Sequence, residues 1–150
     1  MSLYEKDKSP SFYELRKTIK RLLQDAGPSR IRAGDQEFVE MAISFLEADP
    51  YFDCSGYYKS NLVRYLKFVA FTPSQEERLR KLVLRVIDDY GPYRGQHVCR
   101  VAASVQSPEF IAEIQDRRKS QDCNIRRRAD YMVQYLRRFD HGKPKRQPRP

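Results

Sequence analysis

Apolar side chains recur every three or four positions over most of the chain, and this spacing gathers them on one face of an α-helix. The most regular run contains Leu79, Leu82, Val83, Val86, Ile87 and Tyr90. Nowhere do polar and apolar residues alternate over a useful length, as they would in a strand with one buried face. The pattern predicts an all-α protein of about seven helices.

Residues that start or end helices divide this pattern. A Ser, Thr or Asp side chain can accept a hydrogen bond from a free N–H of the first helical turn, and proline at the first helical position loses no needed donor. Such starts occur at Ser11, Asp35, Thr72-Pro73, Ser107-Pro108 and Asp122. Helices are expected to end at Gly27-Pro28, Asp49-Pro50 and Gly91-Pro92. Residues 27–34 are predicted to be a loop, and two further helices are expected over 57–70 and after Gly95.

The last two predicted helices, over residues 107–139, contain the clearest motif. Asp122, Ile125, Arg126 and Ala129 fit the pattern Asp-x-x-(Val/Ile)-Arg-x-x-Ala. This pattern resembles the second helix of a HEAT-like repeat. The resemblance implies that Asp122 and Arg126 are structural and tie neighbouring repeats together.

The predicted helices also group into three consecutive pairs of about 33 to 38 residues, a length typical of helical repeats. The HEAT-like interpretation covers about residues 35–139 and implies antiparallel pairs stacked as a short α-solenoid. A compact helical bundle is the alternative. Residues 1–10 are expected to be a flexible lead, residues 11–139 one all-helical domain, and residues 140–150 a disordered basic tail. The tail has three prolines and no apolar side chain, so it cannot repay the entropy of ordering.

The net charge of +9 indicates an anionic partner or a general affinity for anions. The charge is uneven along the chain. Residues 107–150 contain 12 Lys and Arg against 6 Asp and Glu, whereas residues 1–106 contain 17 against 14. Two-thirds of the excess therefore lies in the last third of the sequence.

The sequence contains no apolar run long enough to cross a membrane and no apolar segment of a secretory signal near its start. Its three cysteines, Cys54, Cys99 and Cys123, are an odd number without a close pair. A reducing, cytoplasmic setting is expected, with no membrane partner.

Candidate catalytic chemistry is sparse, so no catalytic residue, metal ligand or cofactor is predicted. The two histidines are His97 and His141, and no Cys/His spacing matches a zinc site. The loop Gly91–Gly95 lacks the lysine of a phosphate-binding loop. Some HEAT-like proteins resemble DNA glycosylases, whose sites use tryptophans and an acidic residue. This chain has no tryptophan, which argues against that activity.

The last predicted helix has a second stripe opposite its apolar one. Arg128, Tyr131, Tyr135 and Arg138 follow one another at helical spacing, with Arg127 and Gln134 at the border. Arginine with tyrosine can pair with phosphates, stack on bases, or act as hot spots of protein interfaces. The plain alternative is a solvated helix whose tyrosines cover a neighbour. We take Arg127, Arg128, Tyr131, Tyr135 and Arg138 as the candidate binding residues.

Two functions compete for this surface. One is a non-catalytic adaptor that docks another protein, one expected to have an acidic surface, because helical repeats offer extended grooves. The other is a nucleic-acid-binding module that uses the last helix and the tail on phosphates, with affinity that falls steeply with salt. The architecture favours the adaptor, which we therefore prefer, and the charge favours nucleic acid.

Overall fold

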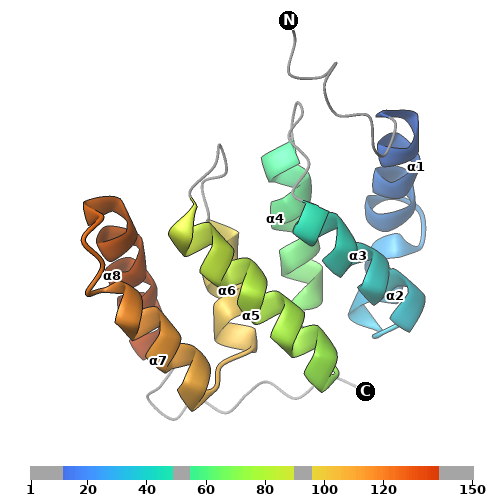
Figure 1. Ribbon diagram of the computed structural model, residues 1–150. Helices are drawn as coiled ribbons and strands as arrows, with labels where there is room; N and C mark the ends of the chain where they lie inside the picture. Colours follow the sequence, from blue (N-terminus) through green and yellow to red (C-terminus); the bar gives the residue numbers. More distant parts are fainter. Residues whose placement is uncertain (1–11, 49–54, 90–95, 139–150) are drawn as a thin grey trace, which may run out of the picture. The chain divides into compact units, whose positions relative to one another are not determined.

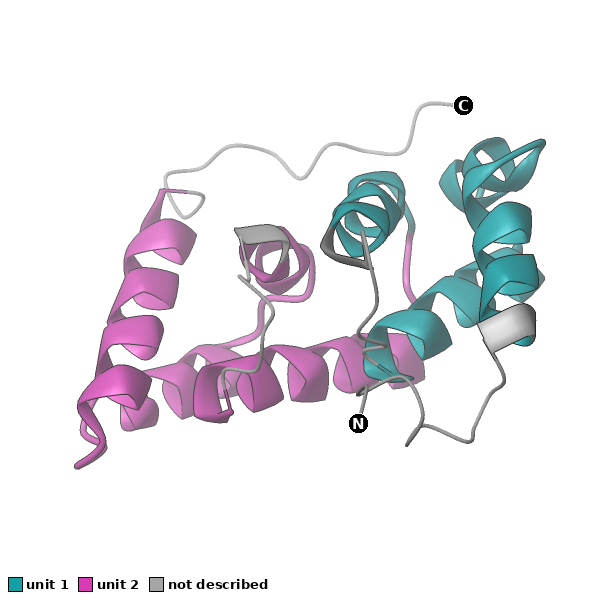
Figure 2. Cartoon of the chain, turned by 90° about the horizontal axis from the view of Figure 1, so that it is seen from above, with its two compact units in different colours: residues 1–69 teal, residues 70–150 magenta. Residues whose placement is uncertain are grey.

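The computed structural model describes residues 12–48, 55–89 and 96–138. Within these ranges the chain forms eight α-helices and no strand (Figure 1). It divides into two compact units, unit 1 over residues 1–69 and unit 2 over residues 70–150 (Figure 2). The all-α prediction is confirmed, and the expected number of about seven helices is one too low.

Unit 1 is built around its second and shortest helix. Its helices are α1 (Phe12–Leu23), α2 (Gly27–Arg32), α3 (Gln36–Ala48) and α4 (Ser55–Leu66). Helix α2 packs against each of the other three, and its Ile31 is completely buried. The rest of this core consists of apolar residues from the other helices: Ile19, Leu22, Phe38, Val39, Ala42, Ile43, Phe45, Leu46, Leu62, Val63 and Leu66.

Helix α2 is the helix that the sequence pattern missed, because residues 27–34 were expected to be a loop. Gly27-Pro28 does lie beyond the end of α1, but Pro28 also occupies the first turn of α2, where its missing N–H is not needed. The residue at the N-cap is Ala26, which has no side chain that could signal a helix start. Asp25, with φ of 54°, makes the turn between the two helices.

Unit 2 consists of two consecutive helix pairs. Its helices are α5 (Pro73–Asp88), α6 (Gln96–Ser104), α7 (Pro108–Arg117) and α8 (Cys123–Arg137). Helix α5 packs against α6 and α7 against α8, and α8 also contacts both α5 and α6. The core of unit 2 contains Leu79, Leu82, Val83, Ile87, Val98, Cys99, Val101, Ala102, Val105, Phe110, Ile114, Ala129, Met132, Val133 and Leu136.

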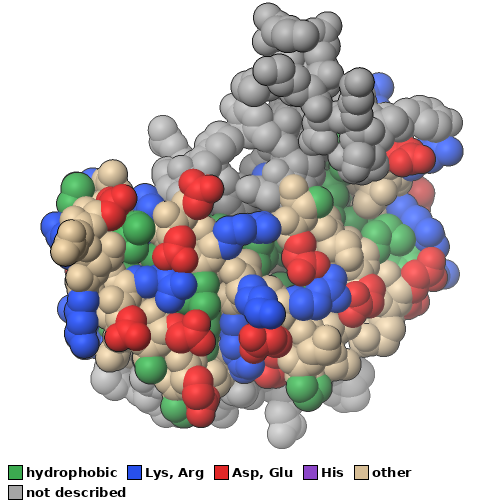
Figure 3. Space-filling view, in the orientation of Figure 1, with side chains coloured by type: hydrophobic (Ala, Val, Ile, Leu, Met, Phe, Trp, Pro, Cys, Tyr) green, Lys and Arg blue, Asp and Glu red, His purple; other side chains and the backbone are tan. Residues whose placement is uncertain are grey.

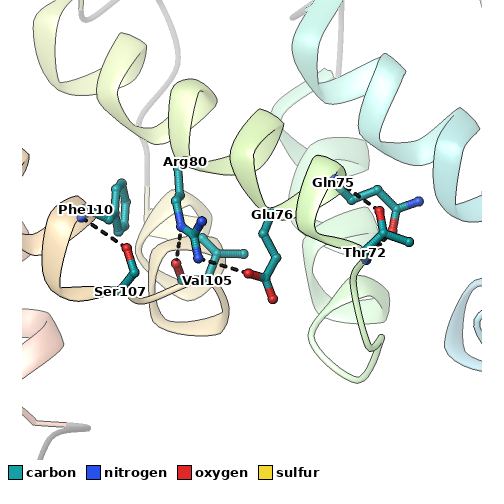
Figure 4. Close-up of polar contacts among 7 residues, drawn as sticks. All are labelled: Thr72, Gln75, Glu76, Arg80, Val105, Ser107 and Phe110. Atoms are coloured by element: carbon teal, nitrogen blue, oxygen red, sulfur yellow. Dashed lines mark hydrogen bonds and ion pairs between the residues drawn. The ribbon is translucent and has the colours of Figure 1, made fainter.

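The predicted helix starts of unit 2 have the expected hydrogen bonds. Thr72 and Gln75 form a reciprocal capping box, which gives the buried Gln75 side chain a hydrogen-bond partner (Figure 4). Ser107 accepts a hydrogen bond from the N–H of Phe110 at 3.1 Å (Figure 4). Asp122 accepts from the N–H groups of Asn124 and Ile125. These caps satisfy donors that would otherwise have no partner at the helix ends.

The described part of the regular apolar stripe on α5 is buried except for Val86, which is half-buried. On α6, Val98, Val101 and Ala102 are buried, whereas Tyr58 and Tyr65 of α4 are only half-buried. Helix α4 ends at Leu66, not at residue 70, and it buries Lys59 to 2 % exposure. The predicted start at Ser11, the ends at residues 49–50 and 91–92, the lead 1–10 and the tail 140–150 lie outside the described residues.

Candidate interaction surface on the last helix

The structure divides the five predicted binding residues between two sides of α8. Arg127, Tyr131 and Arg138 are exposed, whereas Arg128 and Tyr135 are half-buried. The buried side of α8 is formed by Ala129, Met132, Val133 and Leu136. Counting 100° per residue from these positions places Arg127, Tyr131, Gln134 and Arg138 on the opposite side. We call these four residues the outward line.

Arg128 holds α8 against α5. Its Nε donates a hydrogen bond of 2.7 Å to the carbonyl oxygen of Ile87 in the last turn of α5. The last carbonyl groups of a helix have no partner within the helix, and a cation is favourable beside them. Arg128 therefore contributes to the packing of unit 2 through its Nε.

Tyr135 lies toward α6. Burial is the main cause that raises the pKa of its phenol, and the nearby Cys99 thiol raises it further, whereas the positive charge of Arg100 and a hydrogen bond with it oppose the increase. Cys99 and Arg100 both belong to α6. The side chain thus fits the plain alternative considered for the stripe, a tyrosine that covers a neighbouring helix.

The outward line combines one large aromatic side chain with two arginines. Tyr131 is 56 % exposed, one of the highest values among the large hydrophobic side chains of the described residues. Arg127 lies one turn before it and Arg138 two turns after it. Gln134 donates a hydrogen bond of 2.9 Å to Asp130. Arg127 and Arg138 have no ion-pair or hydrogen-bond partner from their side chains among the described residues.

Several other arginines of unit 2 are engaged in the fold. Arg80 donates to the carbonyl oxygen of Val105 at 2.7 Å and pairs with Glu76 at 2.9 Å (Figure 4). Arg117 binds both carboxylate oxygens of Asp88, at 2.7 and 2.9 Å, and this contact raises the pKa of its guanidinium. The positive charge of this part of the sequence is therefore partly structural, and less of it is free for a ligand than composition suggests.

Arg126 also acts locally. Its Nη1 donates to the carbonyl oxygens of Ser120 and Gln121, at 2.7 and 3.0 Å, within the turn that joins α7 to α8. Asp122 caps its own helix. The HEAT resemblance implied that these two side chains tie neighbouring repeats together, whereas these hydrogen bonds lie within one helix pair.

A shallow basin, open to solvent, lies beside the outward line. It has a volume of about 360 Å³ and is lined by Arg118, Cys123, Arg126, Arg127 and Asp130. Arg118 comes from the end of α7 and forms an ion pair of 3.0 Å with Asp130. This set was not predicted from the sequence. The sequence does indicate four of the five residues, because positions 123, 126, 127 and 130 share one side of a helix. Arg118 joins them only through the packing of α7 against α8.

The described residues contain no group of three His, Cys, Asp or Glu side chains that could hold a metal ion. No helix in the same ranges combines the length and apolar character that a membrane span requires. Burial raises the pKa of the Cys99 thiol to about 11, whereas Cys123 is exposed.

No protein-family model matches the chain, and neither a curated protein nor a solved structure is significantly similar to it. The HEAT-like resemblance consequently rests on the motif and on the helical architecture.

Proposed function

We propose that the chain is a non-catalytic adaptor that docks another protein through the outward line of α8. The two helix pairs of unit 2, with α8 packed on α6 as well as on α7, fit a short HEAT-like stack. Such stacks present helix surfaces to partner proteins. We infer a partner with an acidic surface, because the charged side chains of the outward line are arginines.

The observation that carries the proposal is the exposure of Tyr131 between two arginines whose side chains have no partner among the described residues. Tyrosine and arginine are enriched among the residues that dominate protein interfaces. A tyrosine that is 56 % exposed leaves much of its ring in contact with water, and a partner that covers the ring would remove that contact. Arg127 and Arg138 would then provide charge complementarity at the two ends of the contact.

Binding of nucleic acid is the second candidate, and the net charge of +6 over residues 107–150 favours it. A polyanion binds best along a continuous basic track. On the face shown in Figure 3, acidic side chains lie among the basic ones over α5 and α7. Part of this excess charge is also engaged in the fold, since Arg117 pairs with Asp88 and Arg128 donates to the carbonyl oxygen of Ile87. Protein docking is therefore the better-supported function.

A photo-cross-linking experiment tests the proposal. The amino acid p-benzoylphenylalanine replaces Tyr131 in one variant and Tyr57 in a control, since Tyr57 of α4 is also exposed, at 68 %. We expect adducts in cells from position 131 that protease destroys and nuclease leaves intact, and we expect them to disappear when Arg127→Glu is added. Adducts that nuclease destroys would replace the adaptor with a nucleic-acid-binding module. Equal adducts from both positions would remove the outward line as the docking surface.

A further inference from the structure

We propose that the basin formed by Arg118, Cys123, Arg126, Arg127 and Asp130 binds a phosphate monoester, namely a phosphorylated side chain of the docked protein. The inference rests on the proposed function and specifies its partner. Arg127 belongs to both the basin and the outward line, so a phosphorylated residue in the basin would lie beside the segment that covers Tyr131.

The charge of the basin matches a single dianion. Three guanidinium groups and one carboxylate line it, a net charge of +2. A phosphorylated Ser, Thr or Tyr carries a charge of about −1.5 to −2 at neutral pH, and arginine is the side chain best suited to bind it through paired hydrogen bonds. A single carboxylate would leave one positive charge uncompensated.

The acidic groups at the basin are already occupied by donors of the protein. One oxygen of Asp130 pairs with Arg118 at 3.0 Å, and the other accepts from Gln134 at 2.9 Å. Asp122, which precedes Cys123, accepts hydrogen bonds from the first turn of its own helix at 2.8 and 3.4 Å. Because these carboxylates are engaged, they compete less for the remaining arginine donors.

The arginines differ in how firmly they are held. Arg126 is fixed by two hydrogen bonds from its Nη1 to the α7–α8 turn, so its orientation is set before a ligand arrives. Its Nε and Nη2 have no hydrogen-bond partner among the described residues, and the same is true of the whole Arg127 guanidinium. Arg126 would thus offer donors that are already oriented, and Arg127 could move to complete the contact with an oxyanion.

A phosphodiester chain fits this place less well than a monoester. Each phosphodiester carries one negative charge, and affinity for a nucleic acid comes from many such contacts in a row. The basin is one local site of net charge +2 with carboxylates on its lining and border. The same phosphate chemistry could still reach it from a nucleic acid, so the experiment includes that ligand as a separate arm.

The first measurement is a titration of the ¹⁵N-labelled full chain with inorganic phosphate, with sodium chloride at matched ionic strength as reference. We expect saturable amide shifts confined to residues 118–131. Arg127→Gln is expected to weaken the affinity about tenfold, as for the loss of one charge-assisted contact. Arg137→Gln, an exposed arginine of the same helix that does not line the basin, should change it less than twofold.

Two variants at Cys123 distinguish a loss of phosphate binding in the basin from a loss of stability. Cys123→Asp places a carboxylate inside the basin at the first helical position, where an acidic residue is favourable for the helix. We expect it to reduce phosphate affinity at least tenfold with no loss of thermal stability, while Cys123→Ser retains the affinity within about twofold. Shifts scattered over the arginines of the whole chain, or equal affinities of the two variants, would overturn the proposal.

The second measurement compares three ligands: a nine-residue peptide with a central phosphoserine, the same peptide with serine, and a single-stranded oligonucleotide of nine nucleotides. We expect the phosphopeptide to bind at least tenfold more tightly than either. Equal binding of the two peptides would exclude a phosphate-specific site. Tighter binding of the oligonucleotide, weakened equally by Arg127→Gln and Arg137→Gln, would assign the surface to nucleic acid.

The two proposals can fail separately. Tyr131→Ala is expected to abolish protein docking and to leave inorganic phosphate binding unchanged, because Tyr131 does not line the basin. If phosphate does not bind while position 131 still cross-links to a protein, only the phosphate site is wrong. If phosphate binds and no protein adduct forms at position 131, only the docking function is wrong.

Discussion

The two units use arginine in different ways. In unit 1, the guanidinium groups of Arg21 and Arg30 lie over the ring of Phe38 at 5.2 and 5.1 Å. Both side chains also form ion pairs, with Glu37 and Asp35, and remain about half exposed, at 52 and 53 %. In unit 2, Arg80 donates to the carbonyl oxygen of Val105 just after α6 and Arg117 to Asp88 of α5, and these arginine side chains are only 19 and 24 % exposed.

This difference shows that positive charge in the sequence does not measure positive charge available to a partner. A stacked arginine of unit 1 still faces water, and its loss removes a group that lies over the ring. An arginine of unit 2 that binds a carbonyl group at a helix end satisfies a group that has no helical partner, so its loss leaves a partly buried acceptor unpaired. The arginines that remain open, such as Arg127, are better candidates for binding than the total charge indicates.

The largest effect is expected from a substitution that breaks unit 1 alone. A Cβ at Gly27 would overlap with the carbonyl oxygens of Arg21 and Leu22. Because both contacts are with backbone, Gly27→Ala should cost about 3 kcal/mol. Hydrogen exchange should show faster exchange in α1 to α4 and unchanged protection in α5 to α8.

Gly34→Ala is the matched control for that experiment. Gly34 has a φ of 80° but no atom near the position of an added Cβ. The cost should therefore be only the backbone strain of about 1 kcal/mol. If Gly27→Ala lowers protection equally in both units, they unfold together, and the expectation that unit 1 can be destabilised alone is wrong.

The second effect concerns pH and should arise in unit 2. Burial raises the pKa of Cys99 to about 11 from an ordinary value of 9.0. The folded protein keeps this proton between pH 9 and 11, whereas the unfolded chain loses it. The contribution of the thiol to the free energy of unfolding is therefore fully present below pH 9 and decreases as pH rises toward 11. The decrease should reach about 2 kcal/mol.

Thermal unfolding of the wild type and of Cys99→Ala at several pH values checks this expectation. The relevant quantity is the difference between the two pH slopes, because it isolates the contribution of the Cys99 thiol. The variant should have the shallower slope even if its overall stability is lower. Identical slopes would mean that the Cys99 thiol does not contribute.

A smaller difference in stability is expected between variants of two adjacent arginines of α8. Arg128→Met leaves the carbonyl oxygen of Ile87 without its donor and should cost about 1 to 2 kcal/mol. Arg127→Met removes an exposed side chain and should change stability by less than about 0.5 kcal/mol. Urea unfolding of both variants measures the contrast. Equal costs would show that the hydrogen bond to Ile87 has no special role.

The smallest effect is expected for a stacked arginine of unit 1. The guanidinium of Arg32 lies 4.7 Å from the centre of the Tyr65 ring. Arg32→Gln should cost about 0.5 kcal/mol, and Arg32→Lys less, because a lysine cation can still interact with the ring. The same urea experiment applies. A cost above that of Arg128→Met would reverse the order that the comparison of the two units predicts.

Helix starts were predictable from sequence where a side chain performs the capping. Thr72, Ser107 and Asp122 were recognised because each accepts a hydrogen bond from the turn that follows it. Helix α2 was missed because the side chain of its cap residue, Ala26, cannot accept a hydrogen bond, and because a proline such as Pro28 occurs both after the end of one helix and at the start of the next. A helix start is therefore easiest to predict where a side chain can accept a hydrogen bond from the first helical turn.

The candidate site was predictable in part. Tyr131, Arg127 and Arg138 are exposed as a binding surface requires, but helical spacing alone could not show that Arg128 reaches α5 and Tyr135 lies toward α6. A stripe on a helical wheel defines directions around one helix. Which of those directions face a neighbour depends on how that helix is packed.

The sequence by itself determined the all-α class, most helix starts and the apolar side of each regular helix, because these depend on hydrophobic spacing and on groups a few residues apart. The tertiary structure alone decided which arginines support the fold and which stay open. It also brought Arg118 of α7 beside Asp130 of α8, and so formed the basin. The physical reason is distance along the chain: Arg128 and Ile87 are 41 residues apart, and only packing of the core brings them into contact.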